Sequence, residues 1–154
     1  MAKAKSEILV TQSIIDRLAV VDRWPETRNA SLQMYRDSLK RDVEWLLNTR
    51  QPVIPELDSF ANVAASIVNF GLPDIHNYDG SAGKEQSALT LALEKCIKTF
   101  EPRIRNPRVF LAWTDSLSRS LKFHIEGQVV YESQEEEIKF DTVLELLRGE
   151  YEVK

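Results

Sequence analysis

The sequence predicts an α+β fold, with about three to four helices packed on one face of a small, largely antiparallel sheet formed by the C-terminal third of the chain. Apolar residues recur at three- and four-residue spacing up to about residue 100, as they do in amphipathic helices. After Pro107, apolar and polar residues alternate, which is typical of half-buried strands. Helices that come first and strands that come afterwards indicate an α+β arrangement.

The length of the chain favours one hydrophobic core. It has 154 residues, 43% of them hydrophobic, which is enough for one core and too few to expect two domains. Residues 1–11 have the composition of a loose arm, and Ser13 begins a short amphipathic stretch. We therefore predict a flexible N-terminal arm at 1–11 and a single domain at 12–154.

Three longer segments are predicted to be helical. The strongest covers about 30–49, where apolar residues keep helical spacing throughout. A second apolar segment at 60–70 follows, with Asp58 or Ser59 as its expected N-cap. A third amphipathic helix is predicted at about 84–100. The residues that stop or separate these segments are Pro52, Pro55, Gly71 and Pro73.

Alternation with a period of two predicts the strands. They are expected at about 109–113, 121–131 and 138–144, with a short last strand that ends at Val153. The main sheet should therefore span about 107–147.

Charge and cysteine content exclude several classes of protein. The formal net charge of -4 argues against a protein that coats nucleic acid, so we expect no nucleic-acid partner. The single cysteine, Cys96, excludes an internal disulfide and fits a reducing cytosol. Since the sequence has no run of about 18 apolar residues, we expect no direct membrane insertion.

Candidate chemical groups all have a plainer structural explanation. The segment 80–84 has glycines and a lysine but lacks the spacing of a phosphate loop. His76 and His124 have no second histidine or cysteine at ligand spacing, and Cys96 lies at the edge of an apolar stripe. Nothing selects a catalytic pair among the 24 acids. We therefore expect no enzyme activity, no cofactor and no metal.

Glu101-Pro102-Arg103 is the most informative polar group. Pro102 should end the preceding helix at about Phe100 or Glu101, which places an acid where the last carbonyls carry partial negative charge. Arg103, or an arginine of a partner, would compensate that charge. One interpretation is a helix stop with a local ion pair. In the other, an extended backbone projects Glu101, Arg103 and Arg105 on one side as a docking surface.

Two further features bear on a partner surface. Between Lys95 and Arg108 there are five bases, and Glu101 is the sole acid, which suits an acidic or helical partner. Trp45 lies off the apolar stripe through Leu39 and Val43, so it could cover the core or meet a partner. The core is the favoured interpretation for Trp45.

Three motifs in order along the chain carry a family resemblance. They are RDVEWLLNTR at 41–50, VNFGLPD at 68–74 and FEPRI at 100–104. Across roughly residues 13–148 the chain resembles TssE, the baseplate subunit of the type VI secretion system, which is similar to the baseplate wedge protein of contractile phage tails. This family more often has tyrosine in place of Phe70 and leucine in place of Ile104. Both departures keep size and apolar character.

The resemblance implies a structural, non-enzymatic baseplate component. Its implied partners are TssF and TssG in the wedge, TssK at the periphery and the sheath proteins TssB and TssC, whose polymerisation it would help to start. The implied location is cytoplasmic, at the baseplate docked on the inner membrane. Alternatives are a regulatory adaptor of the same fold and, less favoured, a peptidoglycan hydrolase.

The resemblance also implies roles for particular residues. Glu101, Pro102 and Arg103 match the family's hallmark motif and would contact the helical wedge core. Trp45 and Arg105 are candidates for an additional interface on account of their positions in the sequence, and the resemblance assigns them no role. The sheet would offer an edge to sheath strands by β-augmentation.

Overall fold

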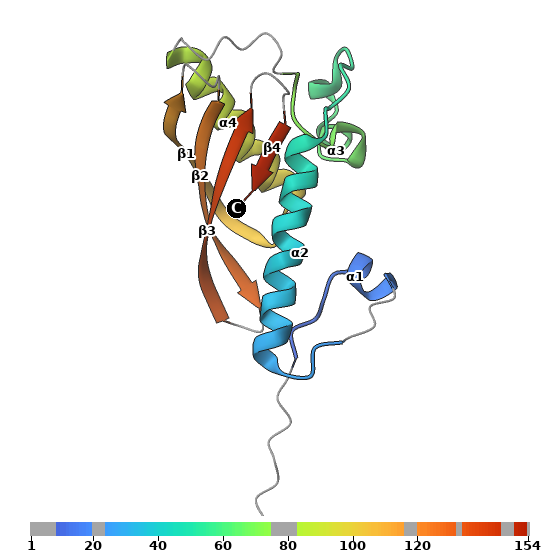
Figure 1. Cartoon of the computed structure of the whole chain (residues 1–154). Helices are drawn as coiled ribbons and strands as arrows, with labels where there is room; N and C mark the ends of the chain where they lie inside the picture. Colours follow the sequence, from blue (N-terminus) through green and yellow to red (C-terminus); the bar gives the residue numbers. More distant parts are fainter. Residues whose placement is uncertain are drawn as a thin grey trace, which may run out of the picture. The chain divides into compact units, whose positions relative to one another are not determined.

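The structure is a computed structural model that describes residues 9–19, 24–74, 83–115, 120–131, 134–145 and 150–153 (Figure 1). The helices are α1 (Ile14–Leu18), α2 (Arg28–Asn48), α3 (Ala61–Ala64) and α4 (Gly83–Phe100), with the 3-10 turns η1 (Leu57–Ser59) and η2 (Ile67–Asn69). The strands are β1 (Ile104–Asp115), β2 (Ser120–Tyr131), β3 (Gln134–Glu145) and β4 (Glu150–Val153). The chain divides into two compact units, Met1–Asp42 and Val43–Lys154.

The fold is α+β, as the sequence predicts. Within the second unit the four strands form one antiparallel sheet in the order β1-β2-β3-β4, so each strand pairs with the next along the chain. The sheet begins at Ile104, three residues before the predicted start at 107. Helix α4 packs against β1 (Figure 1).

The core of the second unit lies between α4 and the sheet. Every second residue of β2 points inward, because side chains alternate across a strand. Helix α4 contributes residues four apart, which share one helical face. Each fully buried apolar side chain of this kind contributes about 1.5–3 kcal/mol. The buried residues are Leu89, Leu93 and Ile97 of α4, Ile104 and Val109 of β1, and Leu121, Phe123, Ile125 and Val129 of β2.

The first unit is organised by hydrogen bonds from its N-terminal segment. Residues 1–8 of the predicted arm lie outside the described residues. Val10 is buried, and its N–H donates to the Ser31 hydroxyl at 3.1 Å. The Gln12 amide nitrogen donates to the carbonyl oxygens of Val10 and Ser31, both at 2.9 Å. Ser13 caps α1, because its hydroxyl accepts from the Asp16 N–H at 3.2 Å.

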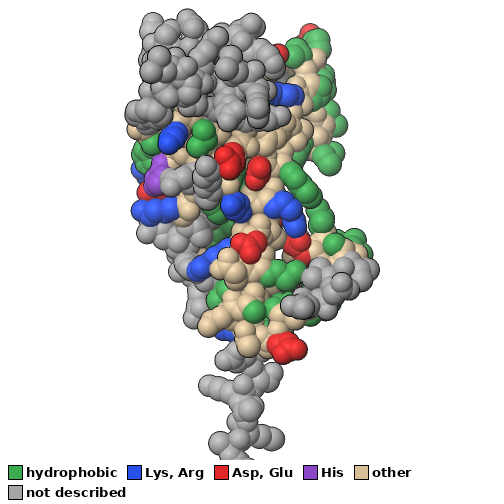
Figure 2. Space-filling view, in the orientation of Figure 1, with side chains coloured by type: hydrophobic (Ala, Val, Ile, Leu, Met, Phe, Trp, Pro, Cys, Tyr) green, Lys and Arg blue, Asp and Glu red, His purple; other side chains and the backbone are tan. Residues whose placement is uncertain are grey.

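The helix predicted at 60–70 is wrong. The segment is broken into η1, α3 and η2. The N-cap position of α3 is occupied by Phe60, which forms no side-chain cap, so neither Asp58 nor Ser59 fills that role. The apolar side chains are not buried: Phe60 is 61% exposed and Ile67 85% exposed, and Figure 2 shows hydrophobic side chains at the surface over this region. Without a buried face, a helix of this length lacks its main source of stability.

A local side chain also favours the break. The Ser66 hydroxyl donates to the Val63 carbonyl at 2.7 Å and accepts from the Val68 N–H at 3.3 Å. Serine side chains that bond neighbouring main-chain groups compete with a continuous helix. The apolar periodicity of 60–70 therefore marks a surface segment rather than a core helix.

Candidate partner-binding surface

Glu101-Pro102-Arg103 forms a tight turn between α4 and β1. The Glu101 N–H donates to the Ile97 carbonyl at 2.8 Å and so closes the last turn of the helix. The Glu101 carbonyl accepts from the Ile104 N–H at 3.0 Å, which makes 101–104 a four-residue turn with Pro102 at its second position. The backbone is therefore turned at this point, and the extended arrangement is not adopted. We call residues 101–103 the Glu-Pro-Arg turn.

An ion pair inside the turn compensates the acid at the end of the helix. Arg103 Nε donates to Glu101 Oε1 at 2.6 Å, and Arg103 Nη2 donates to Oε2 at 2.5 Å. The Arg103 N–H also faces Oε1, at 3.3 Å. The Glu101 side chain is only 7% exposed and that of Arg103 is 24% exposed. Such two-pronged, charge-assisted pairs are among the stronger polar contacts in proteins.

The bonding pattern decides which parts of the turn a partner could meet. Pro102 is exposed, Arg103 is partly exposed and Glu101 is buried. A partner would therefore reach the proline ring and the outer part of the guanidinium, whereas the carboxylate holds the guanidinium in place. Because proline fixes its own φ, little conformational freedom remains for binding to remove.

Trp45 is at the surface, so the favoured prediction that it belongs to the core is wrong. Its side chain is 52% exposed, whereas Val43, Leu46 and Leu47 are almost completely buried. Successive residues of a helix point about 100° apart. Trp45 can therefore face outward although Val43 and Leu46, its near neighbours in the sequence, face the core. Trp45 is thus placed where a large aromatic side chain can meet another protein.

A β-bulge places Arg105 and Arg108 on the same face of the sheet. Arg105 pairs with Gln128 and Arg108 with Glu126, so two residues of β1 oppose the single residue Gly127. Three positions apart in a regular strand, the two arginines would point to opposite faces. Because the bulge adds one residue, both arginines instead lie on the face of the sheet that carries their partners Gln128 and Glu126.

The bulge has two local causes. Asn106 has a φ of 49°, a conformation that asparagine tolerates better than most residues. Opposite it, Gly127 has no side chain, and a Cβ there would collide with the Cγ2 methyl of Ile104. Our sequence reading missed this bulge, although Asn106 followed by Pro107 is a turn-forming pair that could have indicated it.

Other candidate residues have structural surroundings. Cys96 is buried, its thiol donates to the Gly71 carbonyl with a distance of 3.2 Å, and burial raises its pKa to about 12. His124 Nε2 lies 3.9 Å from Glu126 Oε1 on the surface of β2. His76 and residues 80–82 lie outside the described residues, and Gly83 already begins α4.

The part of the chain that the structure describes holds neither a metal-binding cluster nor a membrane-spanning helix. There, no group of three or more histidine, cysteine, aspartate and glutamate side chains is arranged to hold a metal ion. The helices described are also too short or too polar to cross a membrane.

Comparison with known proteins gives one clear match. The sequence profile of baseplate wedge protein gp25 matches residues 33–134, which is more than half of the chain. That span includes the Glu-Pro-Arg turn, Trp45 and the first two strands of the sheet. A comparison with curated proteins gives no match. The chain therefore belongs to the gp25 family of baseplate wedge proteins.

Proposed function

We propose that this protein is the TssE-type subunit of a type VI secretion baseplate, where it has a structural and non-enzymatic role. Family membership makes it a structural component related to phage tail-like baseplates. The observation that carries the finer assignment is the Glu-Pro-Arg turn, a rigid and partly exposed polar element inside the matched span. It suits a fixed contact in an assembly better than it suits catalysis.

The proposed partners follow the same assignment. The Glu-Pro-Arg turn would contact the TssF and TssG wedge core, with Trp45 and Arg105 as additional contacts. TssK would lie at the periphery of the same baseplate, on the cytoplasmic side of the inner membrane. Pre-organisation supports this role, because the ion pair and Pro102 hold the turn in one conformation before a partner arrives.

We further propose that TssB and TssC strands extend the sheet at β3 rather than at β1. Strand β4 pairs only with Thr142–Glu145, so among the described strands none covers residues 134–141 on that side. On β1, Pro107 has no N–H, and the Val109 N–H already donates to Glu94 Oε1 at 2.8 Å. A strand that adds to a sheet needs unpaired main-chain groups, and β3 offers the longer run of them.

The assembly role is tested by co-purification with the TssF and TssG proteins of the same organism. The wild type should co-purify with both, and Pro102→Ala and Arg103→Ala should weaken the complex. Lys122→Ala, an exposed change on β2, is the control and should leave the complex intact. Because Arg103→Ala removes the internal ion pair, equal folding of all variants is first checked by circular dichroism. Failure of the wild type to bind would overturn the assignment.

The hydrolase alternative is poorly supported by the carboxylates of the described residues. Glu101 is buried and bound by Arg103. Glu94 and Glu126 line one open hollow, but Glu94 accepts from the Val109 N–H at 2.8 Å and Glu126 Oε1 lies 3.0 Å from Lys139 Nζ, so both carboxylates are already engaged. The purified protein should release no soluble fragments from peptidoglycan. A turnover that is lost on a single acid substitution, with folding intact, would favour the hydrolase instead. No described feature favours the regulatory adaptor.

A further inference from the structure

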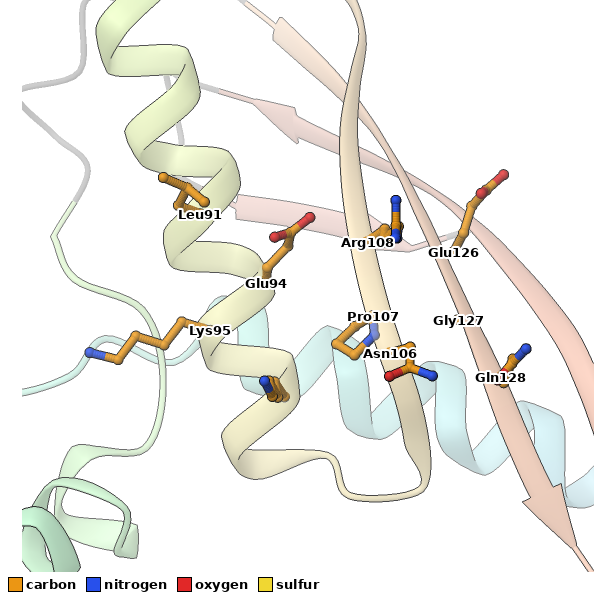
Figure 3. Close-up of a pocket in the computed structure, with 10 residues that line it drawn as sticks. Leu91, Glu94, Lys95, Asn106, Pro107, Arg108, Glu126, Gly127 and Gln128 are labelled. Atoms are coloured by element: carbon orange, nitrogen blue, oxygen red, sulfur yellow. The ribbon is translucent and has the colours of Figure 1, made fainter.

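A hollow with several basic side chains in its lining is formed by α4 and the first two strands of the sheet. It is open to solvent, has a volume of about 970 Å³ and is bounded by α4, β1 and β2 (Figure 3). Helix α4 contributes Leu91, Lys95 and Lys98, and β1 contributes Arg108. We call this site the cationic hollow.

The bases of the cationic hollow are not neutralised by the described part of the protein. Lys95, Lys98 and Arg108 are exposed, and none of them forms an ion pair with a described residue. The two acids at its wall are already engaged. Glu94 accepts from the Val109 N–H, and Glu126 Oε1 lies 3.0 Å from Lys139 Nζ. The hollow therefore presents a surplus of positive charge.

The arrangement of side chains adds an apolar contact to this charge. Leu91, Lys95 and Lys98 follow each other at helical spacing, so they share one face of α4. Leu91 is 64% exposed although it is a large apolar side chain. In Figure 3, Glu94 points toward β1, whereas Lys95 extends away from it and so marks the outer rim of the hollow. Arg108 of β1 lines the same hollow.

We propose that the cationic hollow is the docking site of an acidic segment of another protein. Carboxylates of that segment would meet Lys98 and Arg108, and one apolar side chain would pack on Leu91. The positive charge of the hollow identifies an acidic occupant. Opposite charges attract the two surfaces toward each other and fix how the bound segment is aligned. This inference rests on the hollow itself and uses the proposed function only to place the acidic segment in a baseplate partner.

A protein occupant fits better than a nucleic acid. Among the described residues that line the hollow, none is aromatic and able to stack on a base, and the chain has a formal net charge of -4. The described lining supplies three bases, Lys95, Lys98 and Arg108, which is fewer than the number that usually neutralises the phosphates along a nucleic-acid site.

The test is a titration of the purified full chain with a fluorescent synthetic peptide that is rich in glutamate and contains one leucine. Its glutamine counterpart tests the charge, and a leucine-to-serine version tests the contact with Leu91. Lys98→Glu and Arg108→Glu should each weaken binding of the glutamate peptide by about tenfold. Lys122→Glu, an equal change of charge at an exposed position of β2 five residues from Gly127, should leave it within about twofold.

The outcomes separate this inference from the proposed function. Binding that Lys122→Glu weakens as much as Lys98→Glu does, or no binding of the glutamate peptide at all, would overturn the hollow as a docking site. Equal or tighter binding of a single-stranded oligonucleotide, with the same sensitivity to Lys98→Glu, would also overturn it in favour of a general polyanion site. A protein that fails to join TssF and TssG can still show the expected peptide binding, so the two proposals fail independently.

Discussion

Asn48, at the end of α2, binds the main chain of Tyr151 in β4 through two hydrogen bonds. Its Nδ2 donates to the Tyr151 carbonyl at 2.8 Å, and its Oδ1 accepts from the Tyr151 N–H at 2.7 Å. A side-chain amide offers one donor side and one acceptor, as a peptide group does, so it can replace a neighbouring strand at one position. Asn48 thereby covers part of the outer edge of the short last strand.

Asn48→Ala should lower the free energy of unfolding by about 1–2 kcal/mol, because both main-chain groups of Tyr151 lose their partner. Urea denaturation followed by circular dichroism measures this loss. Asn48→Asp keeps the acceptor but sets a carboxylate oxygen against the Tyr151 carbonyl and a negative charge at the end of α2, so its loss should be at least as large as that of alanine. Equal stability of the alanine variant and the wild type would show that solvent replaces the amide without loss.

The Glu101 and Arg103 side chains should be energetically coupled in the isolated protein. Glu101→Gln and Arg103→Gln should each destabilise by about 1–3 kcal/mol, since each leaves a partly buried charge without its partner. The double variant should lose less than the two single losses combined, by about 1–2 kcal/mol. Strictly additive losses in this double-mutant cycle would mean that the ion pair contributes no stability.

Gly71 is predicted to be intolerant of alanine. Its φ is 109°, and a Cβ there would collide with the carbonyl group of Thr49, next to the main-chain bonds that join Leu72 to Thr49 and Gln51. Because the obstacle is main chain and the backbone conformation is unfavourable, Gly71→Ala should cost about 2–4 kcal/mol.

Gly127→Ala is the matched comparison for this prediction. Its Cβ would meet the methyl group of Ile104, which belongs to a side chain that can shift, and φ at Gly127 is not positive. The loss should therefore be smaller, about 1–3 kcal/mol. A Gly71→Ala protein as stable as the Gly127→Ala protein in thermal unfolding would contradict the argument from the positive φ.

The Asp16–Arg41 ion pair should make stability depend on pH in acid. Arg41 Nη1 lies 2.5 Å from Asp16 Oδ1, and this hydrogen bond holds the pKa of the Asp16 carboxyl below its ordinary value of 3.8. Burial opposes this shift, and the hydrogen bond from Ser13 supports it. A lowered pKa in the folded state means that the unfolded chain binds the proton more tightly. The stabilisation is therefore complete well above pH 3.8 and is lost as the pH falls below that value.

Asp16→Asn and Arg41→Gln test this dependence. Each should be less stable than the wild type at neutral pH, and the difference should shrink as the pH falls below about 4. Urea denaturation at a series of pH values measures it. A difference that stays constant down to about pH 2 would mean that the charge on Asp16 does not contribute to stability.

The long periodic elements could be predicted because their signals repeat many times. The helices expected at about 30–49 and 84–100 are observed as Arg28–Asn48 and Gly83–Phe100, and strand alternation located β2 and the end of β4. The segment at 60–70 misled, because its periodicity matches a helix while its side chains stay at the surface. Periodicity shows which residues would share one side of a helix or strand. Whether that side is buried is decided only by the packing of other segments against it.

The sequence identified the residues of the candidate site, but it predicted their arrangement only in part. Glu101, Pro102 and Arg103 could be selected from a charge at an unfavourable helix position. The sequence did not decide whether the Glu101 carboxylate pairs with Arg103 or with an arginine of a partner protein. Both ion pairs compensate the acid at the end of the helix equally well. The exposure of Trp45 depends on which segments pack around α2, and the sequence around Trp45 does not contain that information. The common face of Arg105 and Arg108 depends on the bulge in β1, which neither arginine indicates by itself.

The sequence by itself determined the class of fold, the end of α4 before Pro102 and the family resemblance, because these depend on spacing and on residues only a few positions apart. The tertiary structure alone decided that Glu101 closes onto Arg103, that Asn48 bonds to Tyr151 and that Gly71 lies against Thr49. Two of these contacts join residues far apart in the chain, and the third depends on the turn that seats Ile104 in the sheet. The two long-range contacts exist only after distant segments have packed, so their energies are set by the folded arrangement rather than by the local pattern.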